Sequence, residues 1–290
     1  MAKLTINKIL GSAVVDSVCK VSTPALAKLA ASASDVSAML DYTAEDGIIA
    51  VYDEASHTVS VAAGDEKTEI KLEFIPCAHP HPIAEKRMVE LDPVAISAEN
   101  GKIALIGDSL FNNWQTPDVD MGMPGEVYNY GVGGYCIPNL DELVVPRYIL
   151  PTSPSVIIVH VGINDMFQGG VPLETYLADV KAFFEKLHTQ LPEAKICFLS
   201  IVRPTDIAPT VSGIVGPEAD ARRDAIDNAN KTMAAYCAER EWAAYLDAEA
   251  AYCDDKGRSK VEDFAGDGIH LLPHAYPAWG RAIAEALLKI

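Results

Sequence analysis

The sequence predicts an α/β fold with a mostly parallel sheet for residues 99–290, and a smaller β-rich accessory domain for residues 1–98. From Lys102 onward, short apolar runs alternate with helical segments, which is the rhythm of a parallel sheet whose strands are joined by helices. Before residue 98, short alternating segments are separated by turns rich in Asp, Glu and Gly, which indicates strands and turns. A chain of 290 residues with 49% hydrophobic and 22% charged residues can build a substantial core.

The first region carries strand-like alternation over residues 48–52, 58–62 and 68–74. Residues 24–40 are rich in Ala and Leu and are expected to form a helix, although the serines in this segment weaken helix formation. The proline-containing stretch from Pro76 to Pro93 is the expected connection between the two domains.

Cys77, His79 and His81 occupy alternate positions within this connection. In an extended chain such side chains point the same way and could share a metal ion. Two neighbouring prolines and the lack of a fourth ligand favour an ordinary linker, so the sequence predicts no metal site.

Five apolar runs in the second region are expected to form the sheet, at residues 103–106, 127–130, 156–161, 195–201 and 243–246. The run at 156–161 shows no polar alternation, which indicates a central strand buried on both faces. Helices are expected at residues 173–187, 218–240 and 275–288. In the first of these the apolar residues recur at three- and four-residue steps, which predicts one face packed on the core.

Four polar or glycine-rich turns are expected at one edge of this sheet, because each follows a predicted strand or precedes a helix. They are Gly107-Asp-Ser-Leu110, Gly131-Val-Gly-Gly134, Gly162-Ile-Asn-Asp165 and Asp267-Gly-Ile-His270. Open α/β sheets bind their ligands at the carboxyl ends of the strands. Each turn alone is ordinary turn or capping chemistry. All four together, in this order, indicate a catalytic site.

The four turns supply the groups that acyl transfer requires. A serine hydroxyl such as that of Ser109 is a weak nucleophile and needs a base, for which His270 is the natural candidate. An orienting carboxylate, Asp267, lies three residues upstream of the histidine. An oxyanion needs preorganised donors. The backbone N–H of Ser109, a glycine N–H from residues 131–134 and the side-chain amide of Asn164 are candidates.

These four blocks resemble those of the SGNH or GDSL hydrolase superfamily, over residues 102–290. The resemblance implies a three-layer α/β/α fold of flavodoxin-like kind and a serine hydrolase that cleaves esters without a metal or cofactor. The pattern Gly-x-Ser-x-Gly of the α/β-hydrolases is absent, since Phe111 stands where its second glycine would be. The N-terminal hundred residues match no part of the family's core, although some carbohydrate esterases of the superfamily carry an N-terminal β-domain.

The resemblance also implies the roles of individual residues. It implies a catalytic triad of Ser109, His270 and Asp267. The oxyanion donors would be Ser109, Asn164 and a glycine, which we carry over to Gly134; a slip in register would make it Gly131 instead.

Residues near these blocks suggest the substrate. Trp114 follows the serine closely and is expected to line the substrate pocket, as is the 203–216 loop. His274 and Tyr276 are expected to begin the last helix. No long apolar lid suited to a long-chain lipase is visible, so we expect an esterase for small acyl groups, with acetyl groups on a carbohydrate as one candidate. Two alternatives stay open: a thioesterase or lysophospholipase, and a catalytically silent binding module on the same fold.

Charge and cysteine content limit which partners and which cellular location are expected. The formal net charge of −18 argues against binding to nucleic acid or to an anionic membrane surface. The six cysteines have no tight, regular spacing and are expected to be mostly reduced thiols. The apolar run at residues 9–15 is a poor signal peptide and too short to span a bilayer. We therefore expect a cytoplasmic location, or a secreted one if a leader has been removed. The oligomeric state is open, a homo-oligomer included.

Overall fold

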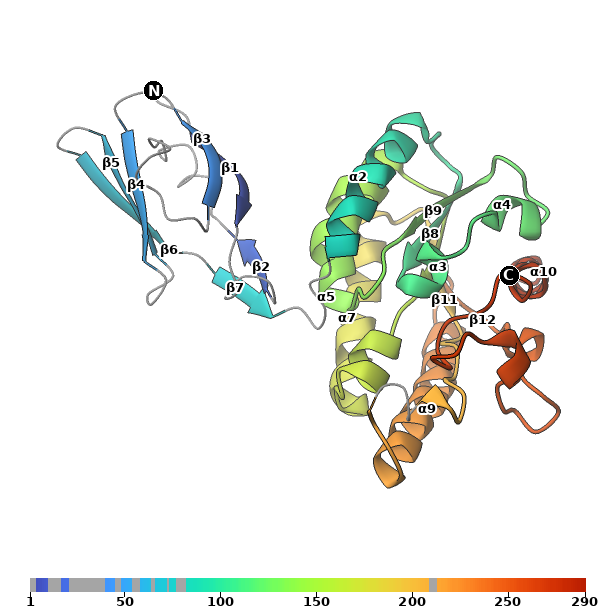
Figure 1. Cartoon of the computed structure of the whole chain (residues 1–290). Coiled ribbons are helices and arrows are strands. Elements are labelled where there is room, and N and C mark those ends of the chain that lie inside the picture. The colour runs from blue at the N-terminus through green and yellow to red at the C-terminus, as the bar shows by residue number, and fades with distance from the viewer. Residues whose placement is uncertain are drawn as a thin grey trace. The chain divides into compact units, whose positions relative to one another are not determined.

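A computed structural model describes residues 4–9, 17–20, 40–44, 48–53, 58–63, 66–71, 73–76, 82–208 and 213–290. Its contacts divide the chain into two compact units, Met1–Pro80 and His81–Ile290. Figure 1 shows both units, and each is considered by itself.

The described part of the first unit consists of short strands in antiparallel pairs. They are β1 (Leu4–Ile9), β2 (Ser17–Lys20), β3 (Leu40–Ala44), β4 (Ile48–Asp53), β5 (Thr58–Ala63), β6 (Glu66–Lys71) and β7 (Glu73–Pro76). β1 pairs with β3, β2 with β7, and β5 pairs with both β4 and β6. The single strand expected at 68–74 is therefore two strands. The helix expected at 24–40 lies outside the described residues, apart from Leu40. The accessory domain as a whole stays a prediction.

The second unit is built on a five-stranded parallel sheet in the order β12-β11-β10-β8-β9. Its strands are β8 (Ile103–Gly107), β9 (Val127–Gly131), β10 (Val156–His160), β11 (Lys195–Leu199) and β12 (Ala243–Leu246). Each strand begins at the residue that the sequence predicts. The strand order reverses between β8 and β10. This is the position at which doubly wound sheets open a ligand-binding crevice.

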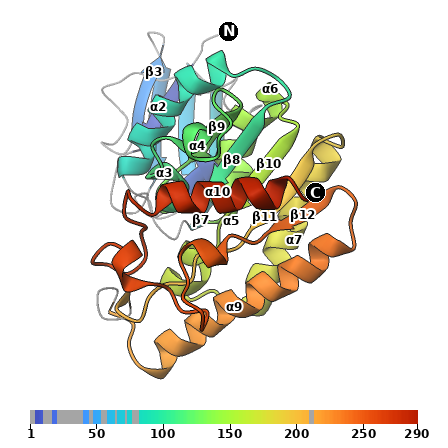
Figure 2. The same ribbon diagram turned by 90° about the vertical axis from the view of Figure 1, so that its right-hand side faces the viewer.

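Helices cover both faces of the sheet and give the three layers that the family resemblance implies. The long helices are α7 (Leu173–Gln190), α9 (Pro217–Ala238) and α10 (Tyr276–Leu287), close to their expected bounds. α7 and α10 lie on opposite faces of the sheet (Figures 1 and 2). α9 packs against α7 and against β11 and β12. None of the described helices is long and apolar enough to cross a membrane.

Shorter elements connect the strands and the long helices. They are α3 (Ser109–Asn112), α4 (Pro117–Asp120), α5 (Ile137–Asn139), α6 (Leu150–Thr152), the π-helices η2 (Leu140–Ile149) and η3 (Ile163–Gln168), and the 3-10 turns η4 (Glu249–Ala251) and η5 (Val261–Asp263). Two of them, α3 and η3, follow β8 and β10 at the reversal point. They therefore begin at the edge where the sequence places its polar turns.

The segment expected to link the two domains is instead largely a helix, α2 (Pro82–Ser97). Ala84, Met88 and Leu91 are buried in the core of the second unit. Their spacing of four and three residues is that of one helix face. The two prolines of the helix conceal this pattern, because Pro82 stands at the first helical position and Pro93 lies inside the helix.

α2 also reaches the edge of the sheet. Arg87 donates hydrogen bonds from Nε to the carbonyl oxygen of Gly131 (3.1 Å) and from Nη2 to that of Asn129 (3.3 Å). The helix is therefore part of the second unit, and the division between the units falls before it rather than after residue 98.

Candidate active site

Ser109 stands where the central sheet reverses its strand order. β8 ends at Gly107, Asp108 caps α3, and Ser109 is the first helical residue. Asp108 accepts the N–H of Leu110 on Oδ1 at 3.0 Å, which is the bond that favours Asp as an N-cap. Any Cβ at Gly107 would collide with the carbonyl oxygen of His160 on β10. Because Gly107 has no side chain, the end of β8 can lie close against β10.

The structure brings the three predicted triad residues together. Nε2 of His270 lies 2.7 Å from Oγ of Ser109, and Nδ1 of His270 lies 2.6 Å from Oδ2 of Asp267. The side chains of His270 and Asp267 are 32% and 34% exposed, so solvent reaches this chain of hydrogen bonds. The arrangement can transfer a proton from the serine to the imidazole while the carboxylate holds the ring in place.

A tight turn makes the Asp267–His270 pairing a local property of the chain. Oδ1 of Asp267 accepts the N–H groups of Ile269 (2.9 Å) and His270 (3.1 Å), which leaves Oδ2 free for the imidazole. Gly268 has φ +70°, and a Cβ there would collide with Oγ1 of Thr205. Thr205 donates its N–H to the carbonyl oxygen of Gly268 at 2.8 Å, so the loop after β11 supports the turn.

These hydrogen bonds also decide the charge of Asp267. Burial alone would raise the pKa of this carboxyl, but the hydrogen bonds from the His270 ring and from the N–H groups of Ile269 and His270 outweigh it and lower the pKa. Asp267 is thus an anion throughout the neutral range, as the orienting residue of a triad must be.

The glycine-rich loop after β9 lies beside the serine. A Cβ placed on Gly133 would be 3.8 Å from Cβ of Ser109. Gly134 has φ +80°, a conformation that glycine adopts readily. Within residues 82–208 and 213–290, its N–H makes no hydrogen bond. Gly131 differs, because its N–H donates to Oδ1 of Asn129 at 2.9 Å. Of the two glycines left open by the sequence, Gly134 is the one with a free N–H.

Asn164 and Asp165 fasten η3 to that glycine-rich loop. Nδ2 of Asn164 donates to the carbonyl oxygen of Tyr135 at 3.1 Å, and the amide carries a second hydrogen. Oδ1 of Asp165 accepts the N–H of Ile137 at 3.2 Å. Burial raises the pKa of Asp165 to about 7, and its Oδ2 has no partner among the described residues. Two side chains of η3 therefore hold it against the residues that follow the glycine-rich loop. The two segments that carry Gly134 and Asn164, the candidate oxyanion donors, are fixed to each other in this way.

The expectation that Trp114 lines the substrate pocket is wrong. Its side chain is only 3% exposed, and Nε1 donates to Oδ2 of Asp120 at 2.7 Å. The indole ring stacks on Tyr276 of α10 (centroids 5.8 Å apart) and packs against Trp279 (5.3 Å). Nearness to the serine in sequence does not place Trp114 in the site, because α10 covers this side of the sheet with aromatic rings.

The loop after β11 contributes one exposed apolar residue beside the turn at residues 267–270, named the catalytic turn below. Ile207 is 37% exposed, and one of its side-chain carbons lies 2.8 Å from where a Cβ on Gly268 would be. Residues 209–212 of the loop expected at 203–216 lie outside the described residues. Tyr276 begins α10 as expected, whereas His274 lies just before the helix. The Tyr276 hydroxyl donates to the carbonyl oxygen of Leu110 at 2.9 Å.

A second histidine–aspartate pair lies behind the serine and was not expected from the sequence. His160 ends β10, and its Nδ1 is 3.2 Å from Oδ1 of Asp108. The signal was a single histidine in the otherwise apolar run at residues 156–161. A polar side chain in a buried strand needs a hydrogen-bond partner.

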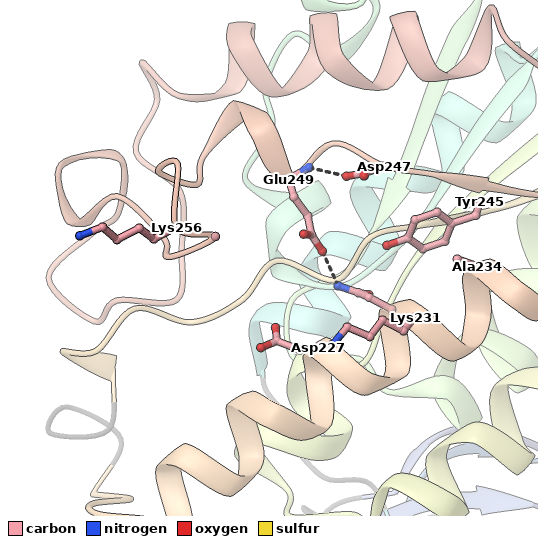
Figure 3. Close-up of a pocket in the computed structure, with 9 residues that line it drawn as sticks. Asp227, Lys231, Ala234, Tyr245, Asp247, Glu249 and Lys256 are labelled. Carbon is pink, nitrogen blue, oxygen red and sulfur yellow. Dashed lines mark hydrogen bonds between the residues drawn. The ribbon is translucent and has the colours of Figure 1, made fainter.

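The described residues also include a cavity that lies apart from the triad. Within residues 82–208 and 213–290, no three His, Cys, Asp or Glu side chains are arranged to hold a metal ion. The motif of Cys77, His79 and His81 lies outside the described residues. A cavity of about 430 Å³ lies between α9 and the segment after β12. Figure 3 shows its lining, in which Glu249 accepts from Asn230 at 3.0 Å. No triad residue lines it.

Comparison with known proteins agrees with this geometry. The sequence model of the GDSL-like lipase/acylhydrolase family matches residues 105–278, which span all four blocks. No curated protein matches the chain. Among solved structures, a Streptococcus pneumonia protein provisionally named a platelet activating factor is 21% identical, with a TM-score of 0.58 over 71% of this chain and 92% of that one. A GDSL-like lipase from Bacteroides thetaiotaomicron is 14% identical, with a TM-score of 0.54 over 70% and 97%. At these identities the likeness concerns the fold.

Proposed function

The chain belongs to the GDSL-like lipase/acylhydrolase family and is an ester-hydrolysing enzyme, and on this premise we propose that it cleaves carboxylic esters of small acyl groups through an acyl-enzyme on Ser109. The observation that carries the proposal is the unbroken chain of hydrogen bonds from Oγ of Ser109 through the imidazole of His270 to Asp267. No metal or cofactor is required for this chemistry.

The first half of the reaction transfers the acyl group to the enzyme. Oγ of Ser109 attacks the ester carbonyl carbon while Nε2 of His270 accepts the hydroxyl proton, and Asp267 stabilises the resulting imidazolium through Nδ1–H. The tetrahedral intermediate collapses when the bond to the alcohol oxygen breaks and His270 returns the proton to that oxygen.

The second half releases the acid. A water molecule gives one proton to His270 and attacks the acyl carbon, and the bond to Oγ of Ser109 breaks as the serine takes that proton back. The carboxylic acid leaves and the enzyme returns to its starting state.

Three donors are proposed for the oxyanion of both intermediates. The N–H of Ser109 has no partner within α3, because it is the first helical residue. The N–H of Gly134 and the second amide hydrogen of Asn164 are the others. Removing one such donor slows acyl transfer by about 10²–10³-fold, which is the loss we expect for Asn164→Ala.

The preference for small acyl groups is supported by the surface around the triad. A long acyl chain gains about 0.8 kcal/mol for each buried CH₂, so a long-chain lipase needs a large apolar surface beside its serine. The side chains of His270 and Asp267 are about a third exposed. Among the described residues, Ile207 is an exposed large apolar residue that lies beside Gly268. Acetyl esters, including O-acetyl groups of carbohydrates, are the substrates that fit such an open site.

Hydrolysis of p-nitrophenyl esters from acetate to palmitate tests the proposal. We expect the largest kcat/KM for acetate, its loss in Ser109→Ala, and no change in Ser97→Ala, an exposed serine of α2. A fluorophosphonate should label Ser109 alone. Acetylated sugars then form the second set of substrates.

The other outcomes separate the remaining hypotheses. A maximum at long chains or with acyl-CoA would replace the small-acyl proposal with a lysophospholipase or thioesterase. A folded protein that neither hydrolyses any ester nor reacts with the fluorophosphonate would be a silent binding module.

A further inference from the structure

A fully buried histidine joins the three loops that leave the centre of the sheet. His160 is 0% exposed, and it lies at the end of β10, four residues before Asn164. Its Nδ1 is 3.2 Å from Oδ1 of Asp108, the residue before the nucleophile. Its Nε2 accepts the N–H of Val202 at 3.3 Å, in the loop after β11.

The second of these bonds fixes the tautomer of the ring. A backbone N–H can only donate, so the Nε2 that faces Val202 must carry a lone pair. The proton of a neutral imidazole is then on Nδ1, where it donates to Asp108. A protonated ring would place an Nε2–H against the N–H of Val202 and break that bond.

The surroundings of His160 leave it no route to substrate or solvent. Its ring packs against Phe111 and Trp279, with centroids 5.6 Å away in each case. Asp108 is the charged group that contacts it, and that side chain is 1% exposed. A ring enclosed in this way cannot exchange protons with a substrate, so its contribution is geometric.

We infer that His160 is a positioning residue for the nucleophile: it holds Asp108, and hence the first turn of α3 that carries Ser109, in fixed register with the loop after β11. That loop in turn supports the catalytic turn through Thr205 and Gly268. His160 thereby links the segments that carry the nucleophile and the base. The inference rests on the proposed function, because it assigns His160 a role in the reaction of Ser109.

Two substitutions separate the hydrogen bonds from the bulk of the ring. His160→Phe keeps a flat ring between Phe111 and Trp279 but removes both bonds. His160→Asn loses the ring, while its amide can still donate to Asp108. Misplacement of reacting groups by about 1 Å costs about 10²-fold in rate, so we expect kcat of His160→Phe to fall by about 10- to 100-fold with little change in KM. His160→Asn should retain clearly more activity.

Tyr148→Phe is the matched control. The Tyr148 side chain is buried like His160, and its hydroxyl bonds to the carbonyl oxygen of Met88 (2.7 Å) and to Oδ1 of Asp92 (3.0 Å), both on α2. We expect its loss of buried hydrogen bonds to lower the melting temperature and leave kcat within about twofold. The rate of fluorophosphonate labelling of Ser109 should fall with kcat in His160→Phe and stay normal in Tyr148→Phe.

Nitrogen-15 NMR of the histidine rings gives a readout that does not depend on activity. One histidine, identified by its absence in His160→Asn, should carry its proton on Nδ1 and a lone pair on Nε2. A proton on Nε2 would overturn the assignment.

The kinetic measurements also test the positioning role of His160. Wild-type kcat in a folded His160→Phe, or equal losses in the Phe and Asn variants, would overturn the positioning role. If His160→Phe does not fold, His160→Asn with normal activity and labelling would support the role, and the loss of both would count against it. A wild type that hydrolyses no ester would instead overturn the proposed function, and the positioning role with it.

Discussion

The two histidine–aspartate pairs that lie next to Ser109 differ in almost everything except composition. His270 and Asp267 are three residues apart in sequence, 2.6 Å apart in space, and a third exposed. His160 and Asp108 are separated by 52 residues, lie 3.2 Å apart, and are fully buried. The first pair faces the serine hydroxyl. The second accepts the backbone N–H groups of Leu110 and Val202 and packs against the rings of Phe111 and Trp279.

The difference shows that surroundings, and not residue type, decide what such a pair can do. The exposed ring has an acceptor nitrogen aimed at a hydroxyl and room to take up a proton. In the buried pair the second nitrogen is already occupied by the N–H of Val202. We therefore expect the exposed pair to act in proton transfer and the buried pair to hold loops in place.

Removing the exposed histidine gives the largest expected effect. His270→Ala should lower kcat by about 10³- to 10⁶-fold, because the serine loses the base that accepts its proton. The control is His274→Ala, a more exposed histidine that also faces an aspartate, Asp263, at 3.2 Å. The exposed His274–Asp263 pair should contribute little to stability or to the rate. Esterase assays check both, and a tenth of wild-type activity in His270→Ala would contradict the assigned base.

Changing each aspartate to its amide compares the two pairs directly. In Asp267→Asn the amide can turn its NH₂ toward Nδ1 of His270 and favour the wrong tautomer, so kcat should fall by about 10²- to 10⁴-fold. In Asp108→Asn, Oδ1 can still accept from Leu110 and His160, so we expect a loss of less than about tenfold. Similar losses in both variants, measured with one ester, would show that the pairs are not distinct in function.

The pH dependence of activity should reflect the His270–Asp267 pair and not the buried His160–Asp108 pair. As the pH falls, protonation of His270 removes the base and the rate declines. Asp267 does not cause this decline, because its lowered pKa keeps it ionised until the solution is more acidic. The midpoint of the decline in kcat/KM should be the same in wild type and His160→Asn. A shifted midpoint in the variant would mean that the buried pair takes part in proton transfer.

A buried carboxyl without a histidine partner, Asp165, is expected to affect stability rather than the rate of the reaction. Burial raises the pKa of Asp165 to about 7, whereas an unfolded chain releases this proton near pH 3.9. Between these two pH values the folded state holds more protons than the unfolded state, so wild-type stability falls as the pH rises. Asp165→Asn removes this slope, which is at most about 1.4 kcal/mol per pH unit.

Melting temperatures measured from about pH 4 to 8 test this prediction. The melting temperature of Asp165→Asn minus that of wild type should increase across the range and level off near pH 7. Its Oδ1 can still accept the N–H of Ile137, so the fold should be retained. An advantage that is constant with pH would mean that Asp165 is ionised throughout.

Much of this architecture could be predicted because its signals are local. The five central strands are continuous apolar runs, and each begins where the sequence indicates. The helix α7 follows from one apolar stripe. The segment of α2 was misassigned because its prolines are strong local signals, while the burial of Leu91 depends on the sheet it packs against. Trp114 was misassigned for a similar reason, since its neighbours Tyr276 and Trp279 come from the other end of the chain.

The parallel sheet and the Asp267–His270 pair follow from local sequence, because strand patterns and a three-residue turn depend on neighbours along the chain. The turn that presents Ser109 is local as well, since Gly107 and Asp108 build it. The contact between His160 and Asp108 depends instead on the tertiary structure, which pairs β8 with β10. Such contacts join residues far apart in sequence, and their partners exist only once the sheet has brought the strand ends to one edge.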